Sequence, residues 1–328
     1  MKKYDVYALG NALVDMEFEV SDDFLSKNGV EKGVMTLVDE ERQHELMCQL
    51  DAFEGNKASG GSAANTVIAL ACFGGDAFYS CRVADDELGE FYMHDLHAAG
   101  VDSNLDGNRQ PGVTGKCLVM VTDDAERTMN TFLGISGSLD SGDLDPDAIR
   151  NSQYLYMEGY LVSSPSGKQA TLDARRIARE AGVKIALTFS DPAMVQFFRE
   201  GLEEMVDDGV DLLFCNEAEA LAYTQTETLP EAVAALKPLA KTFAITRGSQ
   251  GALLYDGQQE IHIAPHPVKA IDSNGAGDMF AGAFLYAITR GDSFEQAGKL
   301  ASLASSRVVS QFGPRLPKEE HAFLLDMV

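Results

Sequence analysis

The stretch Ala270-Ile271-Asp272-Ser273-Asn274-Gly275-Ala276-Gly277-Asp278 joins a Gly-x-Gly turn to a carboxylate, and an apolar segment at 279–288 follows it directly. Apolar residues recur there at spacings of three and four, which predicts a buried helix. Glycines allow close approach of the backbone, and the N–H groups at a helix start can hold an anion. Such a cradle suits a phosphoryl group in transfer, with Asp278 placed to take a proton from an attacking hydroxyl. A tight turn with a stabilised helix start would explain the same residues without chemistry.

The rest of the chain alternates short β-rich runs with longer amphipathic segments. Strands are expected at Val6–Leu9, Ala77–Cys81, Tyr154–Met157, Lys184–Phe189, Asp211–Cys215 and Thr242–Thr246. Helices are expected near 63–73, 86–99, 168–181, 194–205, 217–224 and 230–240. This alternation predicts an α/β fold with a doubly wound, mainly parallel sheet and helices on both faces. Ligands of such sheets bind at the carboxyl ends of the strands.

Two segments, about 12–38 and 112–133, break this pattern because their strand-like runs have no helix between them. They predict a small antiparallel β-sheet lid built from two insertions, and irregular edge strands of the main sheet are the alternative. The chain of 328 residues has no repeat, low-complexity segment or linker. We therefore expect a single domain over 1–328 that carries this lid.

Composition excludes several classes of partner. The chain has 51 acidic and 26 basic residues, a formal net charge of −25, so it repels nucleic acid and anionic membranes. No secretory signal opens the sequence, and no apolar run reaches the roughly 18 residues of a membrane span. Five scattered cysteines indicate reduced thiols rather than a disulfide framework or a zinc site. A cytoplasmic location is expected.

Asp272–Asp278 resembles the second signature of the ribokinase-like, or PfkB, family of small-molecule kinases, with Ser273 in place of the family's threonine. The resemblance implies a ribokinase-like fold and makes Asp278 the catalytic base. The residues that it assigns to the anion hole are Gly275, Ala276 and Gly277. The residues that it assigns to a monovalent cation, with K⁺ as the candidate, are Asp272 and Asn274.

Two motifs near the N-terminus resemble acceptor-binding segments of the same family. One is Gly60–Thr66, which precedes a helix of small residues, and the other is Gly10–Asp15 after the first strand. A helix cap with close packing, or a solvated turn, would explain each motif alone. The residues that the resemblance assigns to the acceptor sugar are Asn11, Asp15, Gly60, Gly61 and Asn65.

Two later motifs resemble the nucleotide side of the family's site. Asn216-Glu217-Ala218-Glu219 alone reads as a helix capping box, and Thr246–Gly251 alone reads as a loop. The resemblance makes Glu219 a ligand of Mg²⁺ through water, since this ion keeps several waters. The residues that it assigns to ATP are Asn216, Thr246, Gly248 and Gly251.

Three segments, Gly10–Asp15, Glu126–Thr128 and Thr188–Ala193, resemble the adenosine-kinase-like branch of the family more than its sugar kinases. Arg127 is then expected to reach the phosphates when the lid closes, with a surface ion pair as the alternative, whereas Asp191 departs from the alanine of that branch. The implied reaction is ATP-dependent phosphorylation of a primary hydroxymethyl group on a ribose-containing nucleoside such as adenosine.

Two other functions stay open on the same fold. One is a sugar kinase acting on ribose, fructose or 2-keto-3-deoxygluconate, and the other is a non-catalytic nucleoside-binding protein. Dehydrogenases, P-loop kinases and serine hydrolases are disfavoured, because the sequence lacks the Gly-x-Gly-x-x-Gly, Gly-x-x-x-x-Gly-Lys and Gly-x-Ser-x-Gly motifs. The protein is expected to be a monomer or a homodimer.

Overall fold

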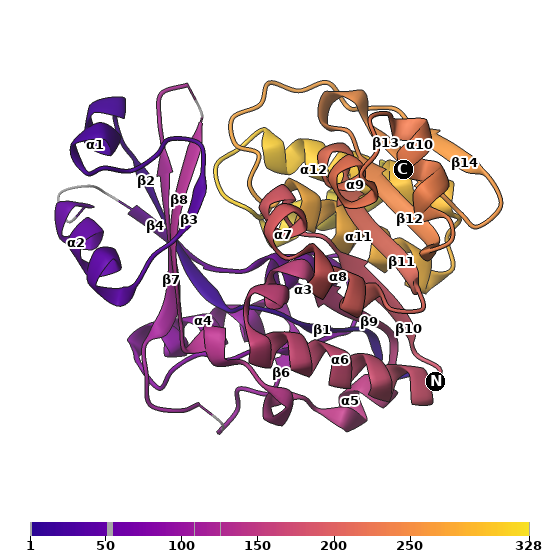
Figure 1. The fold of residues 1–328 in the computed structure, drawn as a ribbon, viewed down its shortest axis with the longest axis horizontal. Helices are drawn as coiled ribbons and strands as arrows, with labels where there is room; N and C mark the ends of the chain where they lie inside the picture. The colour runs from indigo at the N-terminus through magenta and orange to yellow at the C-terminus, as the bar shows by residue number, and fades with distance from the viewer. Residues whose placement is uncertain (1, 51–54, 108, 125, 328) are drawn as a thin grey trace.

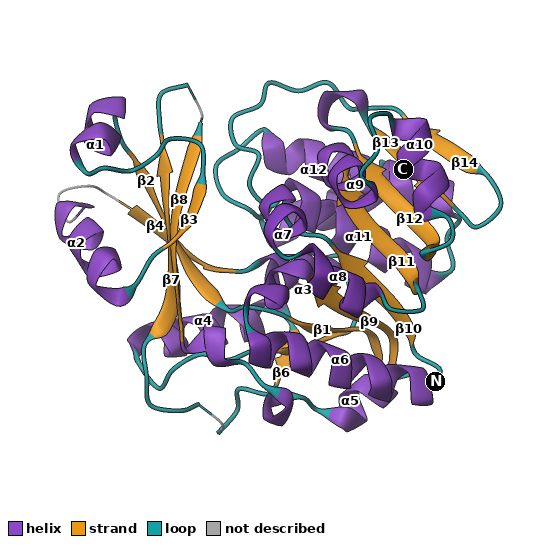
Figure 2. Cartoon of the chain, viewed as in Figure 1, coloured by secondary structure: helices purple, strands orange, loops and turns teal. Residues whose placement is uncertain are grey.

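Two sheets organise the computed structural model, a large one in an α/β body and a small one that projects from it (Figures 1 and 2). The structure describes residues 2–50, 55–107, 109–124 and 126–327. Residues 1, 51–54, 108, 125 and 328 belong to the predicted domain, and residue 125 also belongs to the predicted lid, but they lie outside the described residues.

The large sheet has the order β14-β13-β12-β11-β10-β9-β1-β5-β6. Its strands are β1 (Tyr4–Leu9), β5 (Ala77–Ser80), β6 (Val101–Ser103), β9 (Ser152–Glu158), β10 (Lys184–Thr188), β11 (Val210–Asn216), β12 (Ala240–Thr246), β13 (Ala252–Tyr255) and β14 (Glu260–Ile263). All pairings from β6 to β12 are parallel, and the last two strands add antiparallel. The chain builds the sheet outward from β1 in one direction and then from β9 in the other. The predicted doubly wound, mainly parallel sheet is confirmed, and its switch point lies between β1 and β9.

Helices cover both faces of this sheet. They are α3 (Ser62–Cys72), α4 (Glu87–Ala99), α5 (Pro146–Arg150), α6 (Pro165–Glu180), α7 (Pro192–Phe197), α8 (Arg199–Val206), α9 (Glu217–Thr224), α10 (Leu229–Leu236), α11 (Ala276–Arg290), α12 (Phe294–Val309) and α13 (Lys318–Leu325), with short 3₁₀ turns at Ile135–Ser138, Ser141–Asp143, Gly159–Ser163 and Gly248–Gln250. The single helix expected at 194–205 is wrong, because α7 ends and α8 begins around Phe198. Among the described residues, no helix combines the length and the apolar character that a membrane crossing requires.

Successive side chains of the central strands pack alternately into two separate hydrophobic cores. On β1, Val6 and Ala8 join the core beneath α3, α11 and α12, whereas Tyr7 and Leu9 join the core beneath α6, α8 and α10. All four side chains are fully buried. Burial on both faces explains why these strands are continuous apolar runs in the sequence and could be predicted from it.

The small sheet has the order β3-β8-β7-β2-β4. Its strands are β2 (Leu13–Glu19), β3 (Met35–Leu37), β4 (Gly55–Gly60), β7 (Thr114–Val121) and β8 (Arg127–Gly134). The predicted lid is present, but it is a mixed sheet, because β2 with β7 and β3 with β8 run parallel. The predicted ranges also omit β4, whose sequence Gly-Asn-Lys-Ala-Ser-Gly has no β-branched or aromatic residue to indicate a strand.

Two helices, α1 (Asp22–Lys27) and α2 (Glu40–Leu50), cover the lid on the side away from the body (Figure 1). Leu25, Leu46 and Leu50 of these helices are buried in one cluster with Leu118 and Met120 of β7. The outer face of the lid is therefore packed, and its inner face is turned toward the body.

Candidate active site

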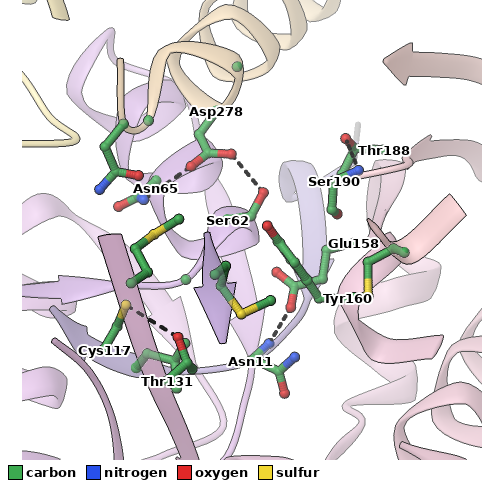
Figure 3. Close-up of a pocket in the computed structure, with 18 of the residues that line it drawn as sticks. Asn11, Ser62, Asn65, Cys117, Thr131, Glu158, Tyr160, Thr188, Ser190 and Asp278 are labelled. Atoms are coloured by element: carbon green, nitrogen blue, oxygen red, sulfur yellow. Dashed lines mark hydrogen bonds between the residues drawn. The ribbon is translucent and has the colours of Figure 1, made fainter. Parts of the chain in front are cut away.

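A cavity of about 540 Å³ lies between the inner face of the lid and the carboxyl ends of the central strands (Figure 3). Asn11 follows β1, Glu158 ends β9, Thr188 ends β10 and Asn216 ends β11, and all four line it. The starts of α3 and α11 complete the wall through Ser62 and neighbouring residues. The cavity therefore opens at the switch point of the sheet, where an α/β fold is expected to bind its ligand.

Asp278 lies in the first turn of α11 and is held from α3. Ser62 Oγ donates to Asp278 Oδ1 at 2.6 Å, and Asn65 Nδ2 donates to Asp278 Oδ2 at 3.1 Å (Figure 3). The surrounding protein desolvates this half-buried carboxyl and raises its pKa to about 6, while the two donors act in the opposite direction. A carboxylate that is ionised at neutral pH, and still basic enough to accept a proton, meets the requirements of a general base.

Gly275 precedes Asp278 as the N-cap of α11, with a left-handed φ of 70° and no side-chain cap among the described residues. A Cβ at Gly275 would lie 2.3 Å from the carbonyl oxygen of Pro314, so only glycine fits this turn. Gly277 has open space beside it and lines the cavity together with Gly275, whereas Ala276 lies in the same turn outside the lining. The uncapped start of α11 thus faces the cavity and suits a negatively charged group.

Four of the five residues assigned to the acceptor line the cavity: Asn11, Asp15, Gly61 and Asn65. Gly60 does not, because it packs against Asp15, where a Cβ would lie 2.3 Å from the carboxylate. Asn65 Oδ1 is buried and has no partner among the described residues, so it is available to accept from a ligand. Burial raises the pKa of Asp15 to about 7.

Glu158 is a site residue that sequence reasoning missed. Its side chain is fully buried and lines the cavity. Oε1 accepts from the N–H of Asn11 at 2.6 Å (Figure 3), and Oε2 accepts from the N–H of Ala63 at 2.9 Å. Burial raises the pKa of Glu158 to about 7. The available signal is its position, a carboxylate directly after the predicted strand Tyr154–Met157.

The lid supplies a largely apolar wall. The lid residues that line the cavity and carry apolar or sulfur-containing side chains are Leu13, Met35, Leu37, Cys117, Val119, Met129 and Leu133. Thr131 adds a hydroxyl, which donates to Cys117 Sγ at 3.4 Å (Figure 3). Tyr160, after β9, lines the cavity from the body. The lid wall is thus mostly apolar, although Asp15 of β2 and Arg127 of β8 also line the cavity from the lid. The body side carries the amides of Asn11 and Asn65 and the carboxylates of Glu158 and Asp278.

Arg127 lies at the start of β8, lines the cavity and is 9% exposed. Its Nη2 contacts Asp272 and lies 3.1 Å from Glu17 Oε1. Nε and Nη1 are buried without a partner among the described residues. Arg127 therefore lines the cavity with two nitrogen donors that have no partner among the described residues, and its contact with the phosphates stays a prediction.

Asp272 is buried beneath Arg127 rather than open to the cavity. Its Oδ1 accepts from the N–H of Asn274 at 2.8 Å, and its Oδ2 accepts from the N–H of Gly313 at 2.8 Å as well as from Arg127. Both oxygens are thus engaged by donors. Asn274 lines the cavity. A K⁺ site at Asp272 and Asn274 stays a prediction.

Of the residues that the resemblance assigns to ATP and Mg²⁺, Asn216, Glu219 and Thr246 line the cavity. Asn216 Nδ2 donates to Glu219 Oε1 at 2.7 Å, and Asn216 Oδ1 caps the helix by accepting from the N–H of Glu219 at 2.8 Å. The capping box is present, and burial raises the pKa of Glu219 to about 7. Glu219 is thus a buried carboxylate with no cationic partner among the described residues and lies next to an amide oxygen, a donor set that suits hydrated Mg²⁺.

Gly248 and Gly251, also assigned to ATP, lie in the turn after β12 and are not part of the cavity lining. Gly251 has a φ of 85°, and a Cβ there would lie 2.0 Å from the carbonyl oxygen of Ile263. The glycine is thus explained by the turn between β12 and β13. An ATP contact of either residue stays a prediction.

Comparisons with known proteins agree with the motifs. Residues 34–321 match the model of the pfkB family carbohydrate kinases. The chain is similar to the adenosine kinase from Sinorhizobium meliloti, with 37% identity, a TM-score of 0.91 and 99% of both chains covered. It is also similar to a probable sugar kinase protein from Rhizobium etli, with 36% identity, a TM-score of 0.92 and 100% of both chains covered. An adenosine kinase of Saccharomyces cerevisiae is 26% identical over 337 residues, which cover 96% of this chain and 97% of that protein.

Proposed function

The chain belongs to the PfkB family of carbohydrate kinases, phosphotransferases with an alcohol group as acceptor, and we propose that its acceptor is adenosine or a closely related ribonucleoside. The observation that carries this proposal is a largely apolar lid wall next to a group of polar side chains. Asn11 and Asn65 from the body and Asp15 from the lid offer two amides and a carboxylate to the hydroxyls of a ribose. The apolar lid wall offers a surface for a flat, weakly polar base. A free pentose or ketose has no group to fill that wall.

The proposed reaction transfers the γ-phosphoryl group of ATP to the 5′-hydroxyl. Asp278 takes the hydroxyl proton while the bond from O5′ to phosphorus forms and the bond from phosphorus to the departing ADP oxygen breaks. The uncapped helix start at Gly275, Ala276 and Gly277 stabilises negative charge on the phosphoryl oxygens. Arg127 supplies its two free donors to the same group and is carried there by the lid.

Asn216 and Glu219 are the residues that would hold Mg²⁺ through water beside the phosphates, and the bound ion would neutralise part of their charge. Thr246, Gly248 and Gly251 complete the proposed ATP contacts. The lid keeps water away from the phosphoryl group, because water would otherwise compete with the nucleoside as its acceptor.

We further propose a monomer in the cytoplasm. The outer face of the lid is packed beneath α1 and α2, which argues against a dimer formed through that face. Light scattering of the purified protein tests the oligomeric state, with a mass near 35.4 kDa expected. A mass of twice that value would establish the homodimer.

An acceptor panel tests the proposed function. ATP consumption is measured with adenosine, other ribonucleosides, ribose, fructose and 2-keto-3-deoxygluconate at equal concentrations. We expect the highest kcat/KM with adenosine or another purine ribonucleoside. Turnover of a free sugar with none of any nucleoside would instead establish the sugar kinase, and no turnover despite nucleoside binding would establish the non-catalytic binding protein.

A further inference from the structure

Glu158 is a buried carboxylate to which the mechanism above gives no task. It ends β9 and is fully buried, and no ion pair involves it within the described part of the chain. Each of its oxygens accepts from one main-chain N–H, from Asn11 at 2.6 Å and from Ala63 at 2.9 Å. Gly10 leaves room for this arrangement, because a Cβ there would lie 2.4 Å from Glu158 Oε2.

The two N–H groups belong to segments that are far apart in the sequence and both carry acceptor-binding residues. Asn11 follows β1, and Ala63 lies in the first turn of α3, between Ser62 and Asn65. The same turn of α3 provides both donors to Asp278. Glu158 therefore joins the segment after β1 to the helix turn that holds the base, and Figure 3 shows it between Asn11 and the start of α3.

Only a carboxylate can accept hydrogen bonds from the N–H groups of both Asn11 and Ala63 at once. An apolar side chain would leave both N–H groups unpaired in the interior, and a glutamine offers one acceptor oxygen and turns an N–H₂ group toward the second N–H. An ionised carboxylate is also expensive to bury without a cation, so its two charge-assisted hydrogen bonds must offset part of its desolvation.

We propose that Glu158 is a positioning residue that fixes the acceptor-binding segment at Asn11 against the start of α3. The inference rests on the proposed nucleoside kinase function. Because both oxygens are engaged by the main chain, Glu158 acts on the acceptor through Asn11 and α3 rather than by contact with a ribose hydroxyl. The ATP side of the cavity, at Asn216 and Glu219, is built from other elements and is independent of this connection.

The test is Glu158→Gln, assayed with adenosine, 2′-deoxyadenosine and 3′-deoxyadenosine. Loss of one hydrogen bond to a charged group corresponds to roughly a 10- to 100-fold change. We expect KM for the nucleoside to rise by about that factor, KM for ATP to stay within about twofold, and the ratio of mutant to wild-type kcat/KM to be the same for all three nucleosides. Glu219→Gln is the matched control, a buried carboxylate on the nucleotide side, and is expected to raise KM for ATP instead.

A ratio that returns to one for either deoxynucleoside would show that Glu158 contacts the missing hydroxyl and would overturn the positioning role. An unchanged KM for the nucleoside, or an equal rise in both KM values, would overturn it as well. Should Glu158→Gln fail to fold by circular dichroism, Glu158→Asp keeps the charge but reaches only one N–H, and the same three ratios are measured. Wild-type protein that phosphorylates no nucleoside contradicts the proposed function, so the two failures are distinguishable.

Discussion

The hydroxyl of Ser62 donates to the carboxylate of Asp278 at 2.6 Å, across 216 positions of sequence. It brings together two motifs that the sequence presents separately, the Gly-Gly turn before α3 and the Gly-x-Gly turn before α11. The base of the proposed reaction is thus oriented by the same helix turn that carries Asn65. Orientation of the base and binding of the sugar are consequently linked in one small region of the cavity.

Replacing Asp278 by Asn should lower kcat by about 10²- to 10⁴-fold, the usual effect of losing a positioned base. The melting temperature at pH 8 should not fall. Because burial raises the pKa of Asp278 above its unfolded value, the folded state binds this proton more tightly, so ionisation above pH 6 opposes folding and its removal relieves that effect. Steady-state kinetics and calorimetry check both parts. Near-normal turnover would remove Asp278 from the mechanism.

The activity should decline at low pH with an apparent pKa near 6, because only the carboxylate form of Asp278 accepts a proton. Ser62→Ala removes a donor that lowers this pKa, so the acidic limb of kcat/KM should move to higher pH, and Ser62→Thr should restore it. Asp15, Glu158 and Tyr156 also face the carboxyl of Asp278, and burial raises the pKa of Asp15 and of Glu158 to about 7. The variants are therefore compared with wild type over one pH series. An acidic limb that stays in place in Ser62→Ala would contradict the role of this hydrogen bond.

Arg127 should matter for both stability and turnover. Arg127→Gln leaves the buried Asp272 without its cation, which typically destabilises a protein by about 3–5 kcal/mol. Adding Asp272→Asn should recover much of that loss, but not the decrease in kcat of about 10²- to 10³-fold expected when a donor to the phosphoryl group is lost. Urea unfolding and kinetics of the single and double variants separate the two effects. Full recovery of kcat in the double variant would reduce Arg127 to a structural role.

The apolar lid wall should determine the affinity of the protein for the adenine ring of the nucleoside. Met129→Ala removes a side chain that lines the cavity, and partial loss of its burial corresponds to about a tenfold rise in KM for adenosine. Met129→Leu, which keeps the apolar volume, should change KM little. KM for ATP serves as the internal control in both variants. An unchanged KM for adenosine in Met129→Ala would show that the adenine ring does not bind against the lid wall.

Sequence reasoning identified the parts of the molecule in which local pattern and tertiary role coincide. The central strands are buried on both faces and so appear as continuous apolar runs, and Gly275 and Gly61 are fixed by backbone geometry that only glycine meets. Asn11 comes just after a predicted strand and Asp278 directly before a predicted helix, so both could be predicted at the edge of the sheet where ligands bind.

What the sequence could not show depends on long-range partners. β4 is a strand because β2 lies beside it, although its residues have no strand preference. Glu158 is a site residue because Asn11 and Ala63 turn their N–H groups toward it, and no local pattern encodes that contact. Conversely, Gly60 and Gly251 match family motifs, but close packing against Asp15 and Ile263 already requires glycine at these two positions.

The most direct test of the account identifies the phosphorylated atom. Protein, MgATP and adenosine are incubated together and the products are followed by ³¹P NMR, with 5′-deoxyadenosine in a parallel sample. We expect ADP and adenosine 5′-monophosphate in equal amounts from adenosine and no nucleotide product from the analogue. Phosphate appearing at another hydroxyl, or ATP consumed equally in both samples, would contradict a cavity that presents the 5′-hydroxyl to Asp278.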